Sequence, residues 1–439
     1  MTIHRSIILT ILCFCSWLGN AQSLYFPPLT GNAWDTISPS SLGWCQERID
    51  TMYEMLDENQ TKAFIILKDG KIVLEKYFGT FVQDSVWYWA SAGKSLTSFL
   101  VGLAQEEGFL SLSDTTAAYL GEGWTACTPE QEEKITIRHQ LTMTTGLDDY
   151  VPEPFCTLDT CLQYKADAGT RWAYHNAPYT LLDGVIEEAT GQTLNGYFNQ
   201  KVRTSTGITG IFLPSGYNNI FWSKPRSMAR YGLMILNKGN WNGNQVMTDA
   251  DYFNSMINTS QNLNLSYGYL WWLNGKASYM LPTLQFVFQG SLMPHAPDDM
   301  VMALGKNGQY INVVPSQNLV LIRMGNAPDG NEVPVTLNDK IWEHIYNLNC
   351  AVTAVDHEYE VAATLQVFPN PSFGYINIDL PGQSFDVYMC DMMGHEVFHR
   401  TDYFSQGRVE VDVLPGLYFL KIATSNGQSF FRSISFLKK

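Results

Sequence analysis

The chain has 439 residues and is 45% hydrophobic and 16% charged, which is the composition of a folded protein long enough for two or more domains. Its 27 Lys and Arg residues stand against 42 Asp and Glu residues, a formal net charge of −15, and no basic run occurs. Nucleic acids and anionic membranes are bound by clustered Lys and Arg, so the charge argues against both as partners.

The first residues, MTIHRSIILTILCFCSWLGNAQS, predict a secretory signal peptide. A basic start leads into an apolar run from Ile7 to Leu18 and then to small residues at Gly19 and Ala21. We expect cleavage after Ala21, so that residues 1–21 are removed. A membrane anchor is the weaker interpretation because the apolar run is too short to span a bilayer, and no stable anchor is expected elsewhere.

Export places the remaining cysteines in an oxidising compartment, where some of them should pair. Cys156 and Cys161 are close enough to close a small loop, and Cys45 and Cys350 could join the two ends of the main body. The sequence leaves the connectivity open. None of the cysteines has metal-ligand spacing, and we expect no metal and no other cofactor.

Residues 40–350 alternate helical and strand patterns, which favours an α/β body with a helical insertion, and we place this domain at 35–350. The Lys68-Asp69-Gly70 step predicts the turn of a hairpin over 62–79. Apolar residues on both sides of Pro315-Ser316 predict two buried strands within 300–326. Helices are expected at 45–59, 91–108, 136–147, 179–202, 227–243 and 339–350.

After Cys350 the pattern changes. Residues 351–363 read as a linker, and 364–439 as short alternating strands broken by Pro, Gly and Asn, which predicts a small all-β sandwich. His395–His399 matches H-E-x-x-H, but zinc binding by that motif requires a helix that brings both histidines to one face. In a strand the two histidines lie far apart, so we predict no metal site.

Ser91 and Lys94 stand three residues apart where the helix over 91–108 begins. A serine at a helix start most often caps the helix, which is the simpler interpretation. Residues three apart on a helix are neighbours, however, so the Lys94 amine reaches back toward the Ser91 hydroxyl. If the aromatic stretch Trp87–Trp89 excludes water, the pKa of Lys94 falls and its neutral amine accepts the serine proton. The alternative to a cap is therefore a nucleophile and its base.

Tyr174 and Asn176 lie in a loop that enters the next helix. A phenol beside a lysine relays a proton to a leaving group, and an amide orients both groups. The alternative is a packed aromatic ring followed by a turn asparagine.

The stretch ALGKNGQY, 303–310, carries two glycines inside an apolar strand. Glycine weakens a strand unless something approaches the backbone closely, and a bound acyl group would do so; a strand bulge is the alternative. The backbone N–H of Gln309 would then join that of Ser91 as an oxyanion hole. Lys306 would offer positive charge to a substrate carboxylate.

Three motifs therefore occur in one order: Ser91-x-x-Lys94, Tyr174-x-Asn176 and Lys306-x-Gly308. Together they resemble the serine β-lactamase and penicillin-binding-protein superfamily, in the branch that holds class C β-lactamases, DD-peptidases and esterases. The resemblance covers most of residues 40–350. It implies an antiparallel sheet flanked by helices, a helical subdomain, and an acyl-enzyme on Ser91 with Lys94 and Tyr174 sharing proton transfer.

The third motif departs from the K-T-G pattern of β-lactamases, whose threonine helps to hold a substrate carboxylate, because Asn307 stands in its place. We therefore expect a serine hydrolase of small esters or amides. The alternative is a β-lactamase, or a D-Ala-D-Ala carboxypeptidase with a peptide substrate. An inactive binding protein on the same scaffold is the second alternative, and the presence of all three motifs argues against it.

The tail stretches VFPNPSFGYINI, DMMGHEVF and VDVLPGLYFLKI resemble the type IX secretion sorting domain of Bacteroidota. With the signal peptide, this resemblance implies Sec export to the periplasm and then passage across the outer membrane to the cell surface or medium. It also implies the secretion machinery as a partner, and removal of the tail. The alternative is a β-sandwich binding module that stays in place.

Overall fold

The computed structural model describes residues 24–327, 334–350, 365–391, 396–425 and 429–437. The chain divides into two compact units, 1–350 and 351–439. The signal peptide expected at 1–21 and the linker expected at 351–363 fall outside the described residues.

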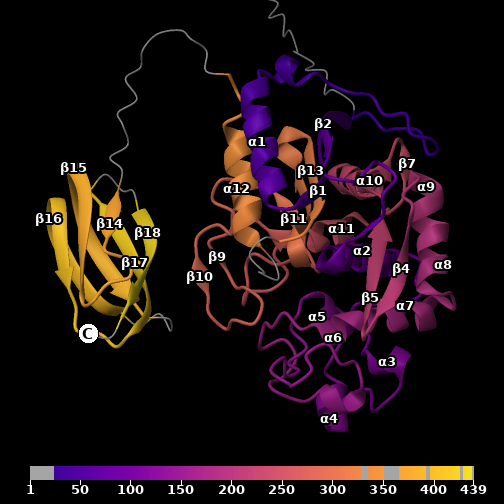
Figure 1. Cartoon of the computed structure of the whole chain (residues 1–439). Coiled ribbons are helices and arrows are strands. Elements are labelled where there is room, and N and C mark those ends of the chain that lie inside the picture. Colours follow the sequence, from indigo (N-terminus) through magenta and orange to yellow (C-terminus); the bar gives the residue numbers. More distant parts are fainter. Residues whose placement is uncertain (1–23, 328–333, 351–364, 392–395, 426–428, 438–439) are drawn as a thin grey trace, which may run out of the picture. The chain divides into compact units, whose positions relative to one another are not determined.

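An antiparallel six-stranded sheet forms the centre of the first unit, with the strand order β2-β1-β13-β12-β11-β8 (Figure 1). Its strands are β1 (Thr61–Lys68), β2 (Lys71–Tyr77), β8 (Trp272–Leu273), β11 (Val301–Gly305), β12 (Gln309–Val314) and β13 (Leu319–Gly325). The predicted hairpin joins β1 to β2 through Asp69 and Gly70, whose φ angles of 51° and 81° are those of a two-residue turn that matches strand twist.

Three strands, not the predicted two, occupy residues 300–326. The chain turns back a first time at the 3-10 turn η5 (Lys306–Gly308) and a second time, as expected, at η6 (Pro315–Gln317). Asn307 and Gly308 have φ angles of 62° and 76°, which a continuous strand cannot contain. The two glycines that interrupt the apolar pattern therefore mark a strand boundary.

Helices cover both faces of this sheet (Figure 1). On one face lie α1 (Gln46–Glu58) and α12 (Val335–Tyr346), and on the other lies α10 (Pro225–Leu236). A Cβ atom at Gly232 of α10 would lie 2.5 Å from the Val320 side chain, so this glycine lets the helix pack closely on the strands. The unit contains the disulfides Cys45–Cys350 and Cys156–Cys161, which are the two pairings that the spacing suggested.

A helical region is inserted between β3 (Trp87–Tyr88) and β8, which confirms the expected antiparallel sheet with a helical subdomain. Of the long predicted helices, the one at 136–147 is shortened and the one at 179–202 is divided. Only α5 forms within 136–147, and Gly191, with a φ of 67°, ends α7 before Thr193 caps α8. The helices of this part are α2 (Lys94–Glu106), α3 (Ala117–Leu120), α4 (Pro129–Glu132), α5 (Ile137–Leu141), α6 (Asn176–Thr180), α7 (Leu182–Thr190), α8 (Leu194–Phe198), the π-turn η4 (Asn199–Arg203), α9 (Thr204–Thr206) and α11 (Ala250–Met256).

Short strands complete the first unit. Strand β3 pairs with β5, and β5 pairs with β4. The short strands and 3-10 turns are β4 (Gly210–Ser215), β5 (Asn218–Ser223), β6 (Asn240–Trp241), β7 (Asn244–Gln245), β9 (Ser278–Tyr279), β10 (Phe288–Gln289), η1 (Pro39–Leu42), η2 (Ala90–Gly93) and η3 (Asp159–Cys161).

The second unit is all-β, as predicted, and its strands form one antiparallel sheet. They are β14 (Gln366–Phe368), β15 (Tyr375–Cys390), β16 (Glu396–Glu410), β17 (Gly416–Thr424) and β18 (Ser429–Phe436). Within the H-E-x-x-H match, His395 lies outside the described residues, while His399 is in β16 and stacks on Tyr388 at 4.1 Å between ring centroids. Across the described part of the chain, no group of three or more His, Cys, Asp or Glu side chains is placed to hold a metal ion.

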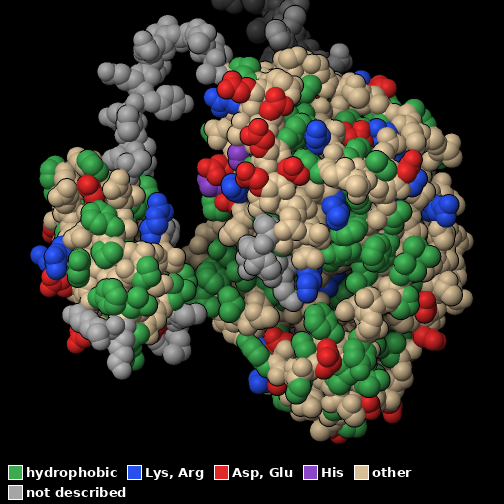
Figure 2. Space-filling model, viewed as in Figure 1, with side chains coloured by type: hydrophobic (Ala, Val, Ile, Leu, Met, Phe, Trp, Pro, Cys, Tyr) green, Lys and Arg blue, Asp and Glu red, His purple; other side chains and the backbone are tan. Residues whose placement is uncertain are grey.

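The surface of the first unit is mixed in charge, with an acidic area over α1 (Figure 2). That helix exposes Glu47, Asp50, Glu54, Asp57 and Glu58. None of the helices described is long and apolar enough to cross a bilayer.

Candidate active site

Ser91 lies in the 3-10 turn η2, which leads directly into α2 at Lys94. The residue before it, Ala90, has a φ of 47°, a left-handed conformation that is costly for a residue with a β-carbon. The N-cap positions of η2 and α2 are Trp89 and Gly93, so Ser91 does not cap the helix. The strained backbone instead presents the serine at the helix entrance.

Strand β11 packs tightly against this turn. A Cβ atom at Gly305 would lie 2.4 Å from the carbonyl oxygen of Trp89 and 2.9 Å from the amide nitrogen of Ala92. We expected the glycines of this stretch to admit a bound acyl group. At Gly305 the close neighbour is instead the turn that holds Ser91, so the glycine fixes the strand edge against the serine.

The Lys94 amine lies 3.1 Å from the Ser91 hydroxyl oxygen and 2.8 Å from Oδ1 of Asn176. Lys94 is 3% exposed, and its nitrogen lies 4.0 Å from the centroid of the Tyr179 ring. Burial lowers the pKa of Lys94 to about 7, against a smaller opposing effect of Asp183. A substantial fraction of this amine is therefore neutral at neutral pH.

The rings that cover Lys94 come from the loop and helix around Asn176, not from the Trp87–Trp89 stretch that we expected. The Lys94 nitrogen lies 5.3 Å from the centroid of the Tyr174 ring and 4.0 Å from the centroid of the Tyr179 ring. Trp89 packs on Phe221 instead, with ring centroids 4.8 Å apart. Sequence reasoning missed Tyr179, although its position one helical turn after Asn176 places both residues on one side of α6.

Tyr174 stacks on Trp272, with ring centroids 5.7 Å apart, and meets the edge of Tyr267. Burial raises the pKa of its phenol well above the ordinary value, and the hydrogen bond with Ser91 lowers it only in part. The phenol is therefore protonated at neutral pH. Tyr267 and Trp272 both belong to the aromatic stretch 267–275, which therefore backs this tyrosine.

Arg323 holds the backbone of the third motif through hydrogen bonds. Its guanidinium is fully buried, and Nη1 donates to the carbonyl oxygens of Asn307 and Gly308 at 3.1 and 2.7 Å. A trans peptide carries its N–H opposite its carbonyl, so the N–H of Gln309 points away from Arg323. A Cβ atom at Gly308 would lie 2.3 Å from Nη1, which explains why glycine occupies this position.

The two polar side chains of the third motif differ in their surroundings. Asn307 donates from its amide to the Tyr88 hydroxyl at 2.6 Å, so this amide already has an acceptor within the protein. Lys306 is exposed. Arg323 was not predicted as part of the site, and Tyr88 was expected only within the stretch that excludes water from Lys94.

A buried carboxyl group, Asp183 on α7, is a further residue that the sequence did not reveal. Burial raises its pKa to about 8, and the neighbouring Asn219 and Lys94 lower it in part. Asp183 is thus largely protonated at neutral pH, which limits how strongly it favours the charged form of Lys94.

Comparisons with known proteins identify a family for each of the two units. The family model described as Beta-lactamase matches residues 56–345, and the model described as Secretion system C-terminal sorting domain matches residues 366–435. The 6-aminohexanoate-dimer hydrolase of Paenarthrobacter ureafaciens is 21% identical over 324 residues, which cover 64% of this chain and 76% of that protein.

Solved structures share the fold of the first unit. A penicillin-binding protein homolog from Caulobacter crescentus has a TM-score of 0.53 at 13% identity, over 70% of this chain and 98% of that chain. A family VIII carboxylesterase has a TM-score of 0.51 at 15% identity, over 70% of this chain and 99% of that chain.

The sorting domain at the C-terminal end indicates secretion by the type IX system to the cell surface or medium. Because the first family match spans well over half of the sequence, the chain belongs to the Beta-lactamase family, the β-lactamase and penicillin-binding-protein-like serine hydrolases.

Proposed function

We propose that the protein is a secreted hydrolase that cleaves an ester or amide bond through an acyl-enzyme on Ser91. The observation that carries this proposal is the 3.1 Å contact between the Ser91 hydroxyl and a buried Lys94 whose pKa is about 7. A lysine with an ordinary pKa is charged at neutral pH and cannot take a proton, whereas this one can.

In the first step the neutral Lys94 amine takes the Ser91 proton while the serine oxygen attacks the carbonyl carbon of the substrate. The oxyanion that forms is held by the backbone N–H groups of Ser91 and Gln309. The carbonyl carbon then loses its alkoxide or amine, which takes a proton from the Lys94 ammonium through the Tyr174 phenol. Water cleaves the acyl-enzyme by the same route in reverse order.

Tyr174 acts in this scheme as a proton relay rather than as a base. Its raised pKa keeps the phenol protonated, and a protonated phenol that hydrogen-bonds Ser91 can donate to a leaving group. Asn176 accepts a hydrogen bond from Lys94 and so holds the amine toward the serine.

Small esters and amides are the proposed substrates. The amide of Asn307 donates to Tyr88, so it does not take the place of the K-T-G threonine as a donor to a substrate carboxylate. This weakens the case for a β-lactam or a D-Ala-D-Ala peptide, whose carboxylate must be bound. The solved carboxylesterase and the 6-aminohexanoate-dimer hydrolase are similar proteins whose names indicate ester and amide cleavage.

The test compares a nitrophenyl ester with a chromogenic cephalosporin, using the wild-type protein and Ser91→Ala. We expect hydrolysis of the ester by the wild type, loss of that activity in Ser91→Ala, and labelling of the wild type alone by a fluorophosphonate. Faster turnover of the cephalosporin would establish the β-lactamase alternative. Absence of both activities and of labelling, in a folded protein, would establish the binding-protein alternative.

A further inference from the structure

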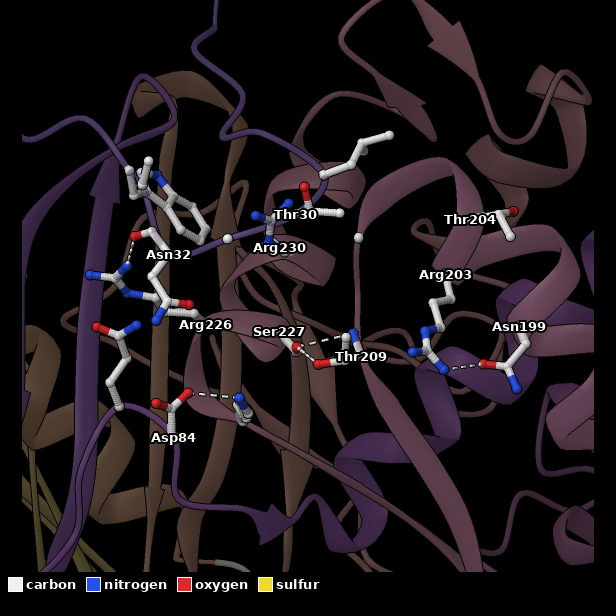
Figure 3. Close-up of a pocket in the computed structure, with 17 residues that line it drawn as sticks. Thr30, Asn32, Asp84, Asn199, Arg203, Thr204, Thr209, Arg226, Ser227 and Arg230 are labelled. Atoms are coloured by element: carbon white, nitrogen blue, oxygen red, sulfur yellow. Dashed lines mark hydrogen bonds and ion pairs between the residues drawn. The ribbon is translucent and has the colours of Figure 1, made fainter.

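A cavity of about 650 Å³ lies in the first unit, and its lining includes none of the residues of the site around Ser91 (Figure 3). Its walls come from the segment Leu29–Trp34, the turn at Gln83 and Asp84, the chain from Asn199 to Thr209, and the first turns of α10. A volume in the range of about 300–1,000 Å³ is typical of sites for small organic molecules and is far more than one inorganic anion fills.

The lining is basic in a chain that is otherwise acidic. Four cationic side chains line it, against the single carboxylate of Asp84, while the whole chain carries a formal charge of −15. The cationic residues are Arg203, Lys224, Arg226 and Arg230. Lys224 is paired with Asp84 at 2.7 Å, and Arg226 is paired with Glu75 at 2.7 Å.

Arg203 and Arg230 have no carboxylate within 4.0 Å among the residues that the structure describes. Arg203 is exposed and donates to Oδ1 of Asn199. Figure 3 shows the two arginines on separate walls, with the Ser227–Thr209 pair between them. Neither charge is thus neutralised by an ion pair, and the two charges lie at separate points of the lining.

Arg230 is a buried cation without a charged partner. It is 6% exposed, and its two terminal nitrogens donate to the carbonyl oxygens of Thr206 and Pro28 at 2.9 and 2.6 Å. The rings of Trp34 and Trp241 flank the guanidinium, each 5.4 Å from it. Neutral carbonyls and rings do not cancel a formal charge, and buried charges in proteins are normally paired.

Neutral hydrogen-bonding groups also line the cavity. They are Thr30, Asn32, Thr204, Thr209 and Ser227, with the half-buried Trp34 beside them. Such groups suit a ligand with many hydroxyls, because hydroxyls both donate and accept hydrogen bonds. Separated cations in a cavity that also presents hydroxyl and amide groups therefore fit an anion that is itself rich in hydroxyls.

We propose that this cavity binds an acidic saccharide, whose carboxylate or sulfate groups meet Arg203 and Arg230 and whose hydroxyls meet the threonine, serine and asparagine side chains. The cavity would hold the protein on an acidic glycan independently of the reaction at Ser91.

Calorimetric titration of the wild-type protein tests the proposal with four probes: a galacturonate trisaccharide, a sulfated disaccharide, the neutral galactose trisaccharide and inorganic phosphate. We expect at least one acidic saccharide to bind, with an affinity that falls as salt is raised, and the neutral trisaccharide not to bind. Equal binding of acidic and neutral sugars, or binding of phosphate alone, would overturn the proposal.

Arg203→Ala should weaken binding of the acidic saccharide at least tenfold, and Arg203→Glu should abolish it. Because Arg203 is exposed, both variants should fold, which their thermal unfolding checks. Arg48→Ala is the matched control, since Arg48 is an exposed arginine on α1 that donates to one backbone carbonyl. An equal loss in Arg48→Ala, or none in Arg203→Glu, would show that binding occurs elsewhere.

Discussion

Lys94 and Arg323 are both buried cations of the candidate active site, yet their surroundings differ. Lys94 has one serine oxygen and one amide oxygen as hydrogen-bond acceptors. Arg323 has five hydrogen bonds, to Thr61 and to the backbone carbonyls of Asn307, Gly308, Asn59 and Asn326. These use all five N–H donors of a guanidinium.

The two cations also differ in whether they can lose a proton at neutral pH. Burial brings the pKa of Lys94 to about 7, whereas the pKa of Arg323 falls only to about 10, and Arg323 stays charged at neutral pH. A sparsely bonded buried amine is suited to proton transfer. A fully bonded guanidinium is suited to fixing the backbone that it binds.

Replacing each cation by methionine separates these two roles most sharply. Lys94→Met should lower kcat/KM for an activated ester by about 10³–10⁴-fold, because the base is lost. The same change should raise the free energy of unfolding by about 1–4 kcal/mol, because a poorly solvated charge is replaced by an apolar side chain. Ester kinetics and denaturant unfolding measure the two effects.

Ser91→Ala is the control for this variant. It should remove activity without the gain in stability, because it removes no charge. A Lys94→Met protein that keeps a tenth of its activity, or that unfolds more easily, would contradict the role assigned to Lys94.

Arg323→Met should have the opposite effect on stability. It leaves four backbone carbonyls without their donor, and we expect the free energy of unfolding to fall by about 3–5 kcal/mol. Denaturant unfolding measures the loss, with the exposed Arg48→Met expected within about 0.5 kcal/mol of wild type. Equal stability of the two variants would show that the carbonyls find other partners.

The pH dependence of ester hydrolysis tests the lowered pKa directly. Because the pKa of Lys94 is about 7, its neutral fraction falls tenfold for each pH unit below that value. The value of kcat/KM should therefore rise with pH up to about pH 7 and then level off. The free energy of unfolding should rise with pH between about pH 7 and 10.5. In that range the unfolded state binds the Lys94 proton and the native state does not. A rising limb centred above pH 9 would rule out Lys94 as the base.

Asp183→Asn should have the smallest effect. It removes a carboxylate that favours the charged form of Lys94, so the rising limb of the kcat/KM profile should move to lower pH. Glu188→Gln, an exposed carboxylate on the same helix, should leave the profile in place. A shift to higher pH in Asp183→Asn would mean that the carboxyl group acts on Lys94 in another way.

Much of the fold was predictable because its signals are local. The α1 helix, the β1–β2 hairpin and the all-β tail follow from periodicity and from turn residues such as Asp69 and Gly70. The pairing of Ser91 with Lys94 was also predictable, because three residues along a helical turn fix their proximity. The extra strand was missed although Asn307-Gly308 is a strong turn signal, because the two glycines of this stretch were interpreted as an interruption within one strand.

The rest of the site depends on contacts between distant parts of the sequence. Arg323 donates to Asn59, 264 residues away, and Asn307 donates to Tyr88, 219 residues away. No local pattern marks such residues, since a buried arginine within an apolar strand reads simply as an interruption. Asn176 was expected to orient its neighbours because of the motif order, and the structure places its amide against Lys94.

The Cys45–Cys350 disulfide closes residues 45–350 of the first unit into a loop, since its two cysteines flank α1 and α12. Proteolytic cleavage at any point beyond Cys350 therefore leaves α12 covalently held at both ends. The new C-terminus does not loosen this helix. Outside the cell, such a covalent link stabilises the folded unit against unfolding and further proteolysis.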